Sequence, residues 1–280
     1  MDDGELVSND SEPAEQGKME AEDVHQLDSG LRYASGEWVR RPLQMVKEIP
    51  LTIYVNQHEL VTVLCTPNKL TQLVIGFLYL EGLVDRPDDV TYLRVCADDG
   101  TAEVRLANRS VQLPSRRVLT SGCSGGVRLS TGTEGLARLS DRHRITPRQI
   151  WLSTRLMREH ARLYPICGGV HISVLTDGER ALAVAEDVGR HNTLDKIAGE
   201  CLLAGVPTRD RVVATSGRIS SEMLTKVAKM GVPVVVSLTS PTHRAVALAQ
   251  ELGITVVGYV RGSSFSVYAH GYRIDGCPHG

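Results

Sequence analysis

Residues 211–260 decide the fold of this chain, and they read RVVATSGRISSEMLTKVAKMGVPVVVSLTSPTHRAVALAQELGITVVGYV. Three β-branched runs in this stretch, at 211–216, 233–239 and 254–260, are separated by segments of roughly a dozen residues whose apolar side chains recur at helical spacing. Strands that alternate with helices in this way predict a mainly parallel sheet with right-handed crossovers. We therefore interpret residues 146–280 as a C-terminal α/β domain.

The chain before this domain shows a different order of elements. The runs IPLTIYV and HELVTVLC predict one hairpin, and DVTYLRVC and TAEVRLA predict a second. Between the two hairpins we expect a helix that begins at Thr66-Pro67 and ends at Gly82. Residues 35–119 therefore read as a smaller N-terminal α+β domain, and a loop and linker at 120–145 joins the two domains.

The N-terminus is strongly acidic. Residues 1–30 hold ten Asp or Glu and one basic residue, Lys18, which gives a charge of −9. Because residues 1–34 contain little apolar surface to bury, we predict that they form a disordered tail. The other 250 residues carry 30 Lys or Arg against 23 Asp or Glu, a balance of +7. This balance favours an anionic ligand.

Composition also limits the class of protein. No stretch approaches the roughly 20 consecutive apolar residues of a membrane helix, and the N-terminus lacks the basic-then-apolar order of a secretory signal. The six cysteines are spread singly, which argues against a disulfide framework. We expect a cytoplasmic protein with reduced thiols, no membrane or nucleic-acid partner, and no metal held by its side chains.

Polar residues gather where the predicted strands end. Open α/β sheets bind ligands beyond the carboxyl ends of their strands, where helix N-termini present free N–H groups. The three runs lead into Ser-containing turns that each hold an arginine: Arg218, Arg244 or Arg261. Together these turns indicate a phosphate-bearing ligand, although each turn alone reads as ordinary helix capping. The chain has no GxxxxGK[ST] motif, which disfavours a nucleotide hydrolase.

A further polar segment, EDVGRHNTLDK at 186–196, follows another predicted strand. Asp187, Arg190, His191 and Asn192 could orient a ligand, and Asn192 could also cap the helix that follows. The alternative interpretation is a salt-bridged helix cap with no ligand.

Cys123 has a different neighbourhood from the other cysteines. It lies in a Gly-rich and Ser-rich loop, Thr120 to Thr133, with no apolar residue within two positions. Three arginines lie nearby in the sequence: Arg116, Arg117 and Arg128. Positive charge favours the thiolate, which is the nucleophilic form, so we predict that Cys123 is reactive. The cysteines expected to be buried small hydrophobes are Cys65, Cys96 and Cys201.

Taken together, these motifs resemble the FdhD family of formate dehydrogenase accessory sulfurtransferases. The resemblance runs from roughly Glu37 to Arg273, and its strongest segments are LTSGCSGG, GGVHIS, EDVGRHNTLDK, TSGRISSEMLTK, PVVVSLTSPT and ITVVGYVRGSSFSVY. It implies a C-terminal domain similar to cytidine deaminases, with a mostly parallel sheet flanked by helices. It also implies that a cysteine desulfurase loads a persulfide onto the loop cysteine, which matches Cys123. That sulfur would pass to a bound substrate, the bis(molybdopterin guanine dinucleotide) molybdenum cofactor, before the cofactor enters formate dehydrogenase.

The resemblance also carries over a cofactor-binding segment and leaves a homodimer open. The segment, which would hold the guanine nucleotide moiety, falls on Tyr259, Val260, Arg261, Gly262, Ser263 and Ser264. Two departures stand out. Many members have CxxC in the loop, whereas here Gly126 replaces the second cysteine, which excludes a loop disulfide but not a single-cysteine persulfide relay. His243-Arg244 also stand where small or apolar residues are more usual.

Two other classes of function remain open. The fold resemblance suggests a zinc hydrolase of the deaminase type, but the HxE and PCxxC signature is missing, and His171 is followed by Ile172 and Ser173. The main alternative is a non-catalytic chaperone that binds the cofactor or the dehydrogenase while Cys123 has no chemical role, because the second loop cysteine is absent.

Overall fold

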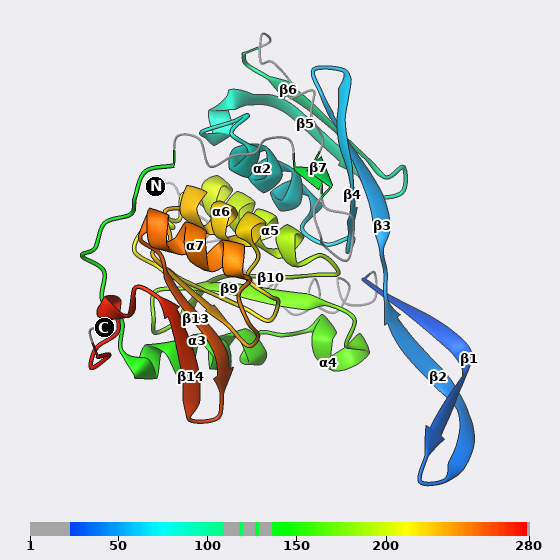
Figure 1. The fold of residues 1–280 in the computed structure, drawn as a ribbon. Helices are drawn as coiled ribbons and strands as arrows, with labels where there is room; N and C mark the ends of the chain where they lie inside the picture. The colour runs from blue at the N-terminus through cyan, green and yellow to red at the C-terminus, as the bar shows by residue number, and fades with distance from the viewer. Residues whose placement is uncertain (1–22, 109–117, 120–126, 129–135, 279–280) are drawn as a thin grey trace, which may run out of the picture.

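The structure is a computed structural model that describes residues 23–108, 118–119, 127–128 and 136–278. The described part consists of a projecting hairpin, a four-stranded sheet and a six-stranded sheet, with a layer of helices between the two larger sheets (Figure 1). Within these ranges, no helix combines the length and the apolar character needed to span a membrane.

The N-terminal strands form a ribbon that extends away from the body of the protein (Figure 1). Strand β1 (Val24–Ala34) pairs antiparallel with β2 (Glu37–Val46), and nearly all of its side chains are exposed. At the tip, the rings of Tyr33 and Trp38 lie 5.2 Å apart. The predicted disorder of residues 1–34 is therefore wrong for 24–34. The acidic composition of the whole segment suggested disorder, but residues 24–34 form a strand that pairs with β2, the next strand in the chain. Residues 1–22 lie outside the described part.

The four-stranded sheet contains both predicted hairpins and has the order β4-β3-β6-β5. Its first hairpin turns at Asn56 and Gln57, which both adopt the left-handed conformation that a two-residue turn requires. The two hairpins join through β3 and β6, which run parallel. The elements are β3 (Ile49–Val55), β4 (His58–Cys65), the single turn η1 (Pro87–Asp89), β5 (Val90–Cys96) and β6 (Thr101–Leu106).

Helix α2 (Leu70–Glu81) packs on this sheet and ends at Gly82 as predicted. Its predicted start is wrong, because the helix begins at Leu70 after a left-handed Lys69. Thr66 serves another purpose: its N–H donates to Asp187 Oδ2 at 3.1 Å, and its hydroxyl oxygen accepts from the N–H of Val188 at 3.1 Å. The segment before α2 is thus bound to the C-terminal half of the chain.

Helix α2 also packs backbone to backbone against α5 (Arg190–Ala204). A Cβ atom placed on Gly76 would lie 1.7 Å from the carbonyl oxygen of Asp195, and one placed on Gly199 would lie 1.9 Å from that of Gln72. Only glycine permits this approach. The two halves therefore share a helix–helix interface, while the division of the chain at 35, 120 and 146 remains a prediction.

The six-stranded sheet has the order β10-β9-β11-β12-β13-β14. Only β11, β12 and β13 run parallel, so two of its five pairings are parallel and three are antiparallel. The prediction of a mostly parallel sheet is therefore wrong. The β9–β10 hairpin, which turns at Asp177-Gly178 as the sequence indicates, and β14, which the sequence pattern did not reveal, add antiparallel strands at the two edges. The strands are β9 (His171–Thr176), β10 (Ala181–Asp187), β11 (Val212–Thr215), β12 (Val234–Ser237), β13 (Thr255–Arg261) and β14 (Ser264–Ala269).

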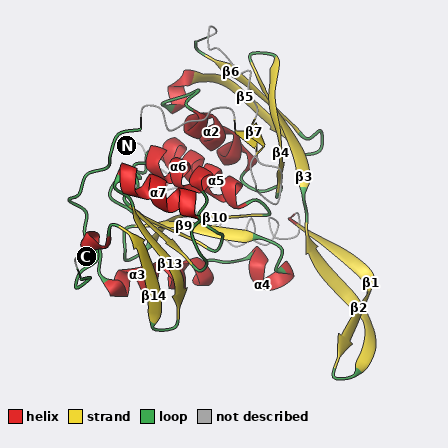
Figure 2. Cartoon of the chain, viewed as in Figure 1, coloured by secondary structure: helices red, strands yellow, loops and turns green. Residues whose placement is uncertain are grey.

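Helices cover both faces of this sheet (Figure 2). Val213 and Val235 face α5, α6 (Ser221–Lys229) and α7 (His243–Leu252), whereas Val212 and Val234 face α3 (Pro147–Glu159). This alternation is the period of two expected of strands buried on both sides. Thr146 caps α3, since its Oγ1 accepts from the N–H of Gln149 at 3.2 Å. The remaining elements are β7 (Val118–Leu119), which pairs with β8 (Val127–Arg128), α4 (Leu163–Cys167) and η2 (Gly271–Arg273).

Candidate functional site

Five strands of the six-stranded sheet have polar residues at the same side of the sheet, where four of the strands end and one begins. Strands β10, β11, β12 and β13 all run toward this edge, and β9, which is antiparallel to its neighbours, begins there. The residues that mark the edge are His171, Asp187, Thr215, Ser237 and Arg261. We call this set of strand ends the polar edge.

The connections that follow β11 and β12 are bound to each other. Ser237 Oγ donates to the carbonyl oxygen of Gly217 at 2.7 Å, and the N–H of Thr242 donates to that of Ile219 at 2.9 Å. Both connections also begin helices with side-chain caps, in which Ser220 Oγ accepts from Met223 and Thr242 Oγ1 accepts from Ala245. Two of the three predicted strand-to-helix turns are therefore confirmed, with the exposed Arg218 on the first connection and the exposed Arg244 in the first turn of α7.

The third turn, after β13, was predicted to lead into a helix, and this prediction is wrong. After β13 the chain turns at Gly262-Ser263 directly into β14, so no helix N-terminus supplies amide groups next to Arg261. This hairpin still joins the polar edge, because the N–H of Tyr259 donates to the carbonyl oxygen of Thr239 at 3.0 Å.

The predicted cofactor-binding segment, residues 259–264, occupies this hairpin. The Tyr259 side chain is exposed, and the Arg261 guanidinium lies 5.7 Å from the centre of its ring. Val260 points the other way, into the core beneath α3, so it can offer a ligand only its backbone. Gly262, Ser263 and Ser264 are exposed at the turn. An exposed aromatic ring beside a guanidinium is a surface on which a planar base can stack.

Asp187 and Asn192 have a structural role in place of the ligand-binding role considered for them. The Asp187 carboxylate forms an ion pair with Lys196 at 2.7 Å, and both side chains are fully buried. Asp187 also accepts from the side chain of Asn192 at 2.7 Å and from the N–H of Gly189 at 2.8 Å. The predicted cap at Asn192 is wrong, since α5 begins two residues earlier with Gly189 as its N-cap. The structure thus favours the salt-bridged alternative for these two residues.

Arg190 and His191, from the same motif, lie instead at the polar edge. A Cβ atom placed on Gly217 would lie 3.1 Å from Arg190 Cβ and 3.4 Å from His171 Nδ1, so both side chains press against this glycine. His191 Nε2 lies 3.4 Å from Ser220 Oγ. His171 was not predicted as a site residue. It enters the edge only because β9 runs antiparallel to β11, which local sequence does not reveal.

The polar edge rests on a layer of buried hydroxyl groups. Ser173 Oγ lies 2.7 Å from Thr193 Oγ1 and donates to Thr215 Oγ1 at 3.0 Å. Thr193 in turn donates to the carbonyl oxygen of Arg190, and Thr215 Oγ1 accepts from the N–H of Gly217 at 3.2 Å. Because each of these groups has a partner, the network fixes the backbone on which the exposed groups stand.

The charge around His171 is positive. Burial lowers the pKa of the His171 imidazole, and the nearby guanidinium of Arg190 lowers it further, with Arg218 contributing in the same direction. Asp187 raises the pKa of His171, with an effect weaker than that of Arg190 but stronger than that of Arg218, and its carboxylate also forms an ion pair with Lys196. Cationic groups that converge in this way favour a bound anion.

Cys123, the predicted catalytic residue, lies outside the described residues. Pairing of β7 with β8 holds together the two ends of the segment 120–126, so the predicted loop, Thr120 to Thr133, is interrupted by a strand at 127–128. Cys65 and Cys201 are buried in the hydrophobic cores, which confirms their assignment as core residues, and this burial raises the pKa of both thiols to about 12. Cys96 is only half-buried, so the same assignment is wrong for it.

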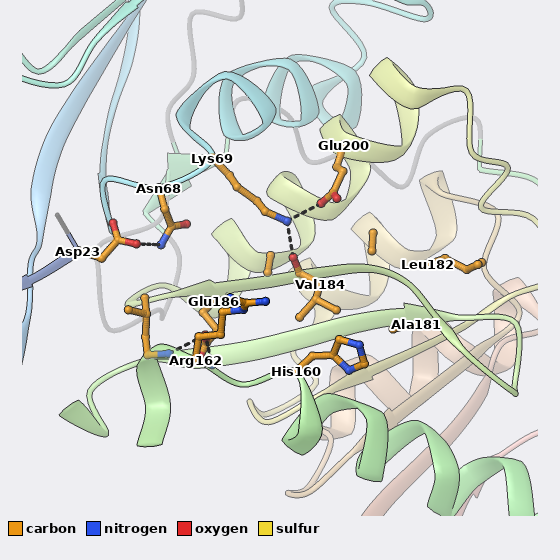
Figure 3. Close-up of a pocket in the computed structure, with 13 residues that line it drawn as sticks. Asp23, Asn68, Lys69, His160, Arg162, Ala181, Leu182, Val184, Glu186 and Glu200 are labelled. Carbon is orange, nitrogen blue, oxygen red and sulfur yellow. Dashed lines mark hydrogen bonds and ion pairs between the residues drawn. The ribbon is translucent and has the colours of Figure 1, made fainter. Parts of the chain in front are cut away.

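A cavity lies beside the outer strand β10 (Figure 3). It has a volume of about 340 Å³. Lys69 reaches into it and donates to the carbonyl oxygen of Val184 and to Glu200, at 2.7 Å each. The Glu186 carboxylate accepts from the N–H groups of Arg162 and Leu163. A lysine bound to an edge carbonyl protects the strand from pairing with another chain, so we interpret this cavity as part of the scaffold.

The fold and the polar edge together define an α/β protein with cations, hydroxyl groups and an exposed aromatic ring at its strand ends, which is where open α/β sheets bind their ligands. The chain belongs to the FdhD/NarQ family, whose model matches residues 46–275.

Relatives and a solved structure agree with this membership. The chain is 40% identical over 249 residues to a protein from Bacillus licheniformis named Sulfur carrier protein FdhD, which covers 87% of this chain and 95% of that protein. It is 37% identical over 252 residues to the protein of the same name from Bacillus subtilis, with the same coverage. A crystal structure from Desulfotalea psychrophila, described as a formate dehydrogenase accessory protein, superposes with a TM-score of 0.74 at 26% identity. That match covers 90% of this chain and 99% of the other.

Proposed function

We propose that this protein is a sulfur carrier that takes sulfur from a cysteine desulfurase as a persulfide on Cys123 and delivers it to the bis(molybdopterin guanine dinucleotide) molybdenum cofactor before that cofactor enters formate dehydrogenase. The observation that carries the proposal is membership of a family whose relatives, matched over most of their length, are named sulfur carrier proteins. The reaction would take place in the cytoplasm, where thiols stay reduced.

The chemistry requires an accessible thiolate. In the loading step, the Cys123 thiolate attacks the outer sulfur of the desulfurase persulfide, a new sulfur–sulfur bond forms, and the desulfurase cysteine leaves as a thiolate. Cys65 and Cys201 cannot serve, because burial raises the pKa of each thiol to about 12 and leaves almost no thiolate at neutral pH. The Gly-rich and Ser-rich surroundings of Cys123 support its assignment to this step.

The cofactor is a substrate in this proposal, and its guanine nucleotide would bind at the polar edge. The Tyr259 ring and the Arg261 guanidinium are suited to stack with guanine, and Gly262, Ser263 and Ser264 are exposed beside them at the turn. In this proposal, the segment 259–264 holds the guanine base.

The proposal is tested by incubating the full-length chain with a cysteine desulfurase and cysteine, and then measuring the mass of each cysteine-containing peptide. We expect the mass of one added sulfur atom on Cys123, and we expect Cys123→Ala to abolish activation of formate dehydrogenase. Cys96→Ala is the matched control, since Cys96 is the half-buried thiol of a strand end and should retain activation. Full activation by Cys123→Ala would contradict sulfur transfer and support the chaperone alternative.

A further inference from the structure

We propose that His143, Arg211 and Arg273 together bind a small tetrahedral oxyanion, of the phosphate or sulfate class, at the amino-terminal end of the six-stranded sheet. Arg211 directly precedes β11, and Arg273 donates to the hydroxyl of Thr255, the first residue of β13, at 3.3 Å. Strands β11 and β13 run in the same direction, so this end of the sheet lies opposite the polar edge. The inference goes beyond the proposed function and uses none of its residues.

The first support is a set of three buried nitrogen atoms that have no hydrogen-bond partner among the described residues. They are Nε2 of His143, Nε of Arg211 and Nε of Arg273. The whole Arg273 side chain is buried. A buried donor without a partner costs about 1 to 3 kcal/mol, so native structures seldom leave one unmatched. Three such nitrogens in one cluster therefore indicate a bound acceptor.

The second support is the charge around His143. Burial has the largest effect and lowers the pKa of its imidazole, and Arg273, Arg211 and Arg144 lower it further through their charge. Asp210 raises it, more strongly than any single one of these arginines lowers it. Three guanidinium groups and one carboxylate thus act on the same ring. An oxyanion offsets the excess of positive charge, whereas a water molecule does not.

The third support is that the remaining nitrogen atoms of Arg273 are already bound. Its Nη2 donates to the carbonyl oxygen of Ser140 at 2.8 Å and lies 3.3 Å from Asp141 Oδ1. The same carboxylate accepts from the Tyr272 hydroxyl and lies 3.7 Å from the guanidinium of Arg138. Because Asp141 is shared among three donors, it neutralises Arg273 only in part. The planar guanidinium is held in a fixed orientation, and its Nε is left to donate to a ligand.

The backbone around this cluster is fixed, and a cavity gives access to it. The N–H of Ile145 donates to the carbonyl oxygen of Arg273 at 2.8 Å, and the N–H of Asp275 donates to that of Ile145 at 2.9 Å. Beside these strands of chain lies a cavity of about 390 Å³, which has room for an oxyanion. It is lined by Arg144, Tyr272, Ile274, Asp275, Gly276 and Cys277. Since the Asp275 carboxylate repels an anion, we place the ligand on the side of Arg144, next to His143.

The test is thermal unfolding of the full-length chain in sodium phosphate, sodium sulfate or sodium chloride at one ionic strength. A ligand that binds only the folded state raises the unfolding midpoint, so phosphate and sulfate should each give a saturable rise that chloride does not give. Arg211→Ala should increase the phosphate concentration for half of this rise by about 10- to 100-fold, as expected for loss of a charged hydrogen bond. His143→Phe should increase it by about 3- to 10-fold, as expected for a neutral one.

Two control variants separate this site from other effects of the anions. Phosphate and sulfate also stabilise folded proteins by exclusion from their surface, and every variant shares this effect. Arg142→Ala is the matched control, because this exposed arginine precedes His143 in the sequence and is not among the groups that act on its imidazole. Arg218→Ala removes an exposed charge at the polar edge. Both controls should retain the saturable rise, and comparison of salts within each variant removes any difference in basal stability.

A rise that does not saturate in the wild type, or one that Arg211→Ala and His143→Phe both retain at the same phosphate concentration, overturns the inference. A second measurement decides the matter where a variant does not fold. In ¹⁵N NMR spectra of the wild type, phosphate should shift the Nε2 resonance of His143 and chloride should not. An unchanged resonance at the phosphate concentration that saturates the midpoint overturns the site. None of these results bears on persulfide transfer by Cys123, which is tested separately.

Discussion

Gly76→Ala tests the contact that joins the two halves of the chain, and its sign alone is informative. Alanine in a helix interior is favoured over glycine by about 1 kcal/mol, so helix propensity alone predicts that this change in α2 stabilises the protein. The structure predicts the opposite. The new Cβ would lie 1.7 Å from the carbonyl oxygen of Asp195 and 2.7 Å from the backbone nitrogen of Gly199. Both are backbone atoms of α5, and neither can rotate away.

The magnitude follows from this overlap. Ordinary van der Waals contact begins at 3.4 Å, so the two helix backbones must separate locally by about 1.7 Å. Forcing extra volume into a packed interior costs about 1 to 3 kcal/mol and at times more, which exceeds the gain from propensity. Because the clash is with rigid backbone atoms, the upper part of this range applies, and subtracting the propensity gain of about 1 kcal/mol leaves a net destabilisation of about 1 to 2 kcal/mol. Gly199→Ala should behave alike, and the double variant should lose less than the sum, because the first change already opens the interface.

Urea unfolding is the assay, with the free energy taken from a midpoint shift at unchanged slope. Thr71→Ala provides the control, since this exposed α2 residue reports propensity alone and should gain a few tenths of a kcal/mol. If Gly76→Ala stabilised the protein as much as propensity predicts, the close packing of α2 on α5 would be refuted.

Three further predictions concern buried charged and thiol groups. Lys196→Met should cost about 3 to 5 kcal/mol in urea unfolding, because it leaves the fully buried Asp187 carboxylate without its counter-charge; a loss below about 1 kcal/mol would contradict the ion pair. Burial raises the pKa of Asp195 from 3.8 to about 6 despite the contact with Lys226, so the folded state binds this proton more tightly than the unfolded state. The free energy of unfolding should therefore fall as the pH rises from about 4 to about 6, and Asp195→Asn should remove that slope. Finally, Cys65 and Cys201 should resist iodoacetamide at pH ~8 in the native protein and react after unfolding, because burial raises the pKa of both thiols to about 12; native labelling of either would show that its burial is wrong.

Local signals predicted the elements whose ends carry turn or cap chemistry. Gly82, Gly205 and Gly253 each end a helix in the left-handed conformation, and Thr146 caps α3, so these boundaries could be read from residue type. The start of α2 could not. Thr66 is a residue type that often caps helices. Its N–H instead donates to the buried carboxylate of Asp187, 121 residues later in the chain, so a tertiary contact overrides the local preference.

The same limit applies to the site. Arg218 and Arg244 were placed correctly because a strand followed by a capped helix is a local pattern. The turn after β13 was wrongly predicted to begin a helix. Residues 261–264 instead lead into the strand β14, which the sequence did not reveal because its apolar alternation is weak and its first half is exposed. His171 was missed because its place at the edge depends on the direction of β9, which is set by pairing and not by sequence.

The motif EDVGRHNTLDK shows how one short segment serves both the scaffold and the site. In a helix, residues three and four positions apart lie on one face, so Asn192 and Lys196 both reach Asp187, while the preceding Arg190 and His191 point toward Gly217 and Ser220. The buried side of the motif also binds the N-terminal half, because Lys196 donates to Asn68 Oδ1 at 2.8 Å. The cations at the polar edge are consequently positioned by the same network that holds the segment before α2. The buried network around Asp187 and Lys196 therefore connects the N-terminal half of the chain to the exposed groups of the polar edge.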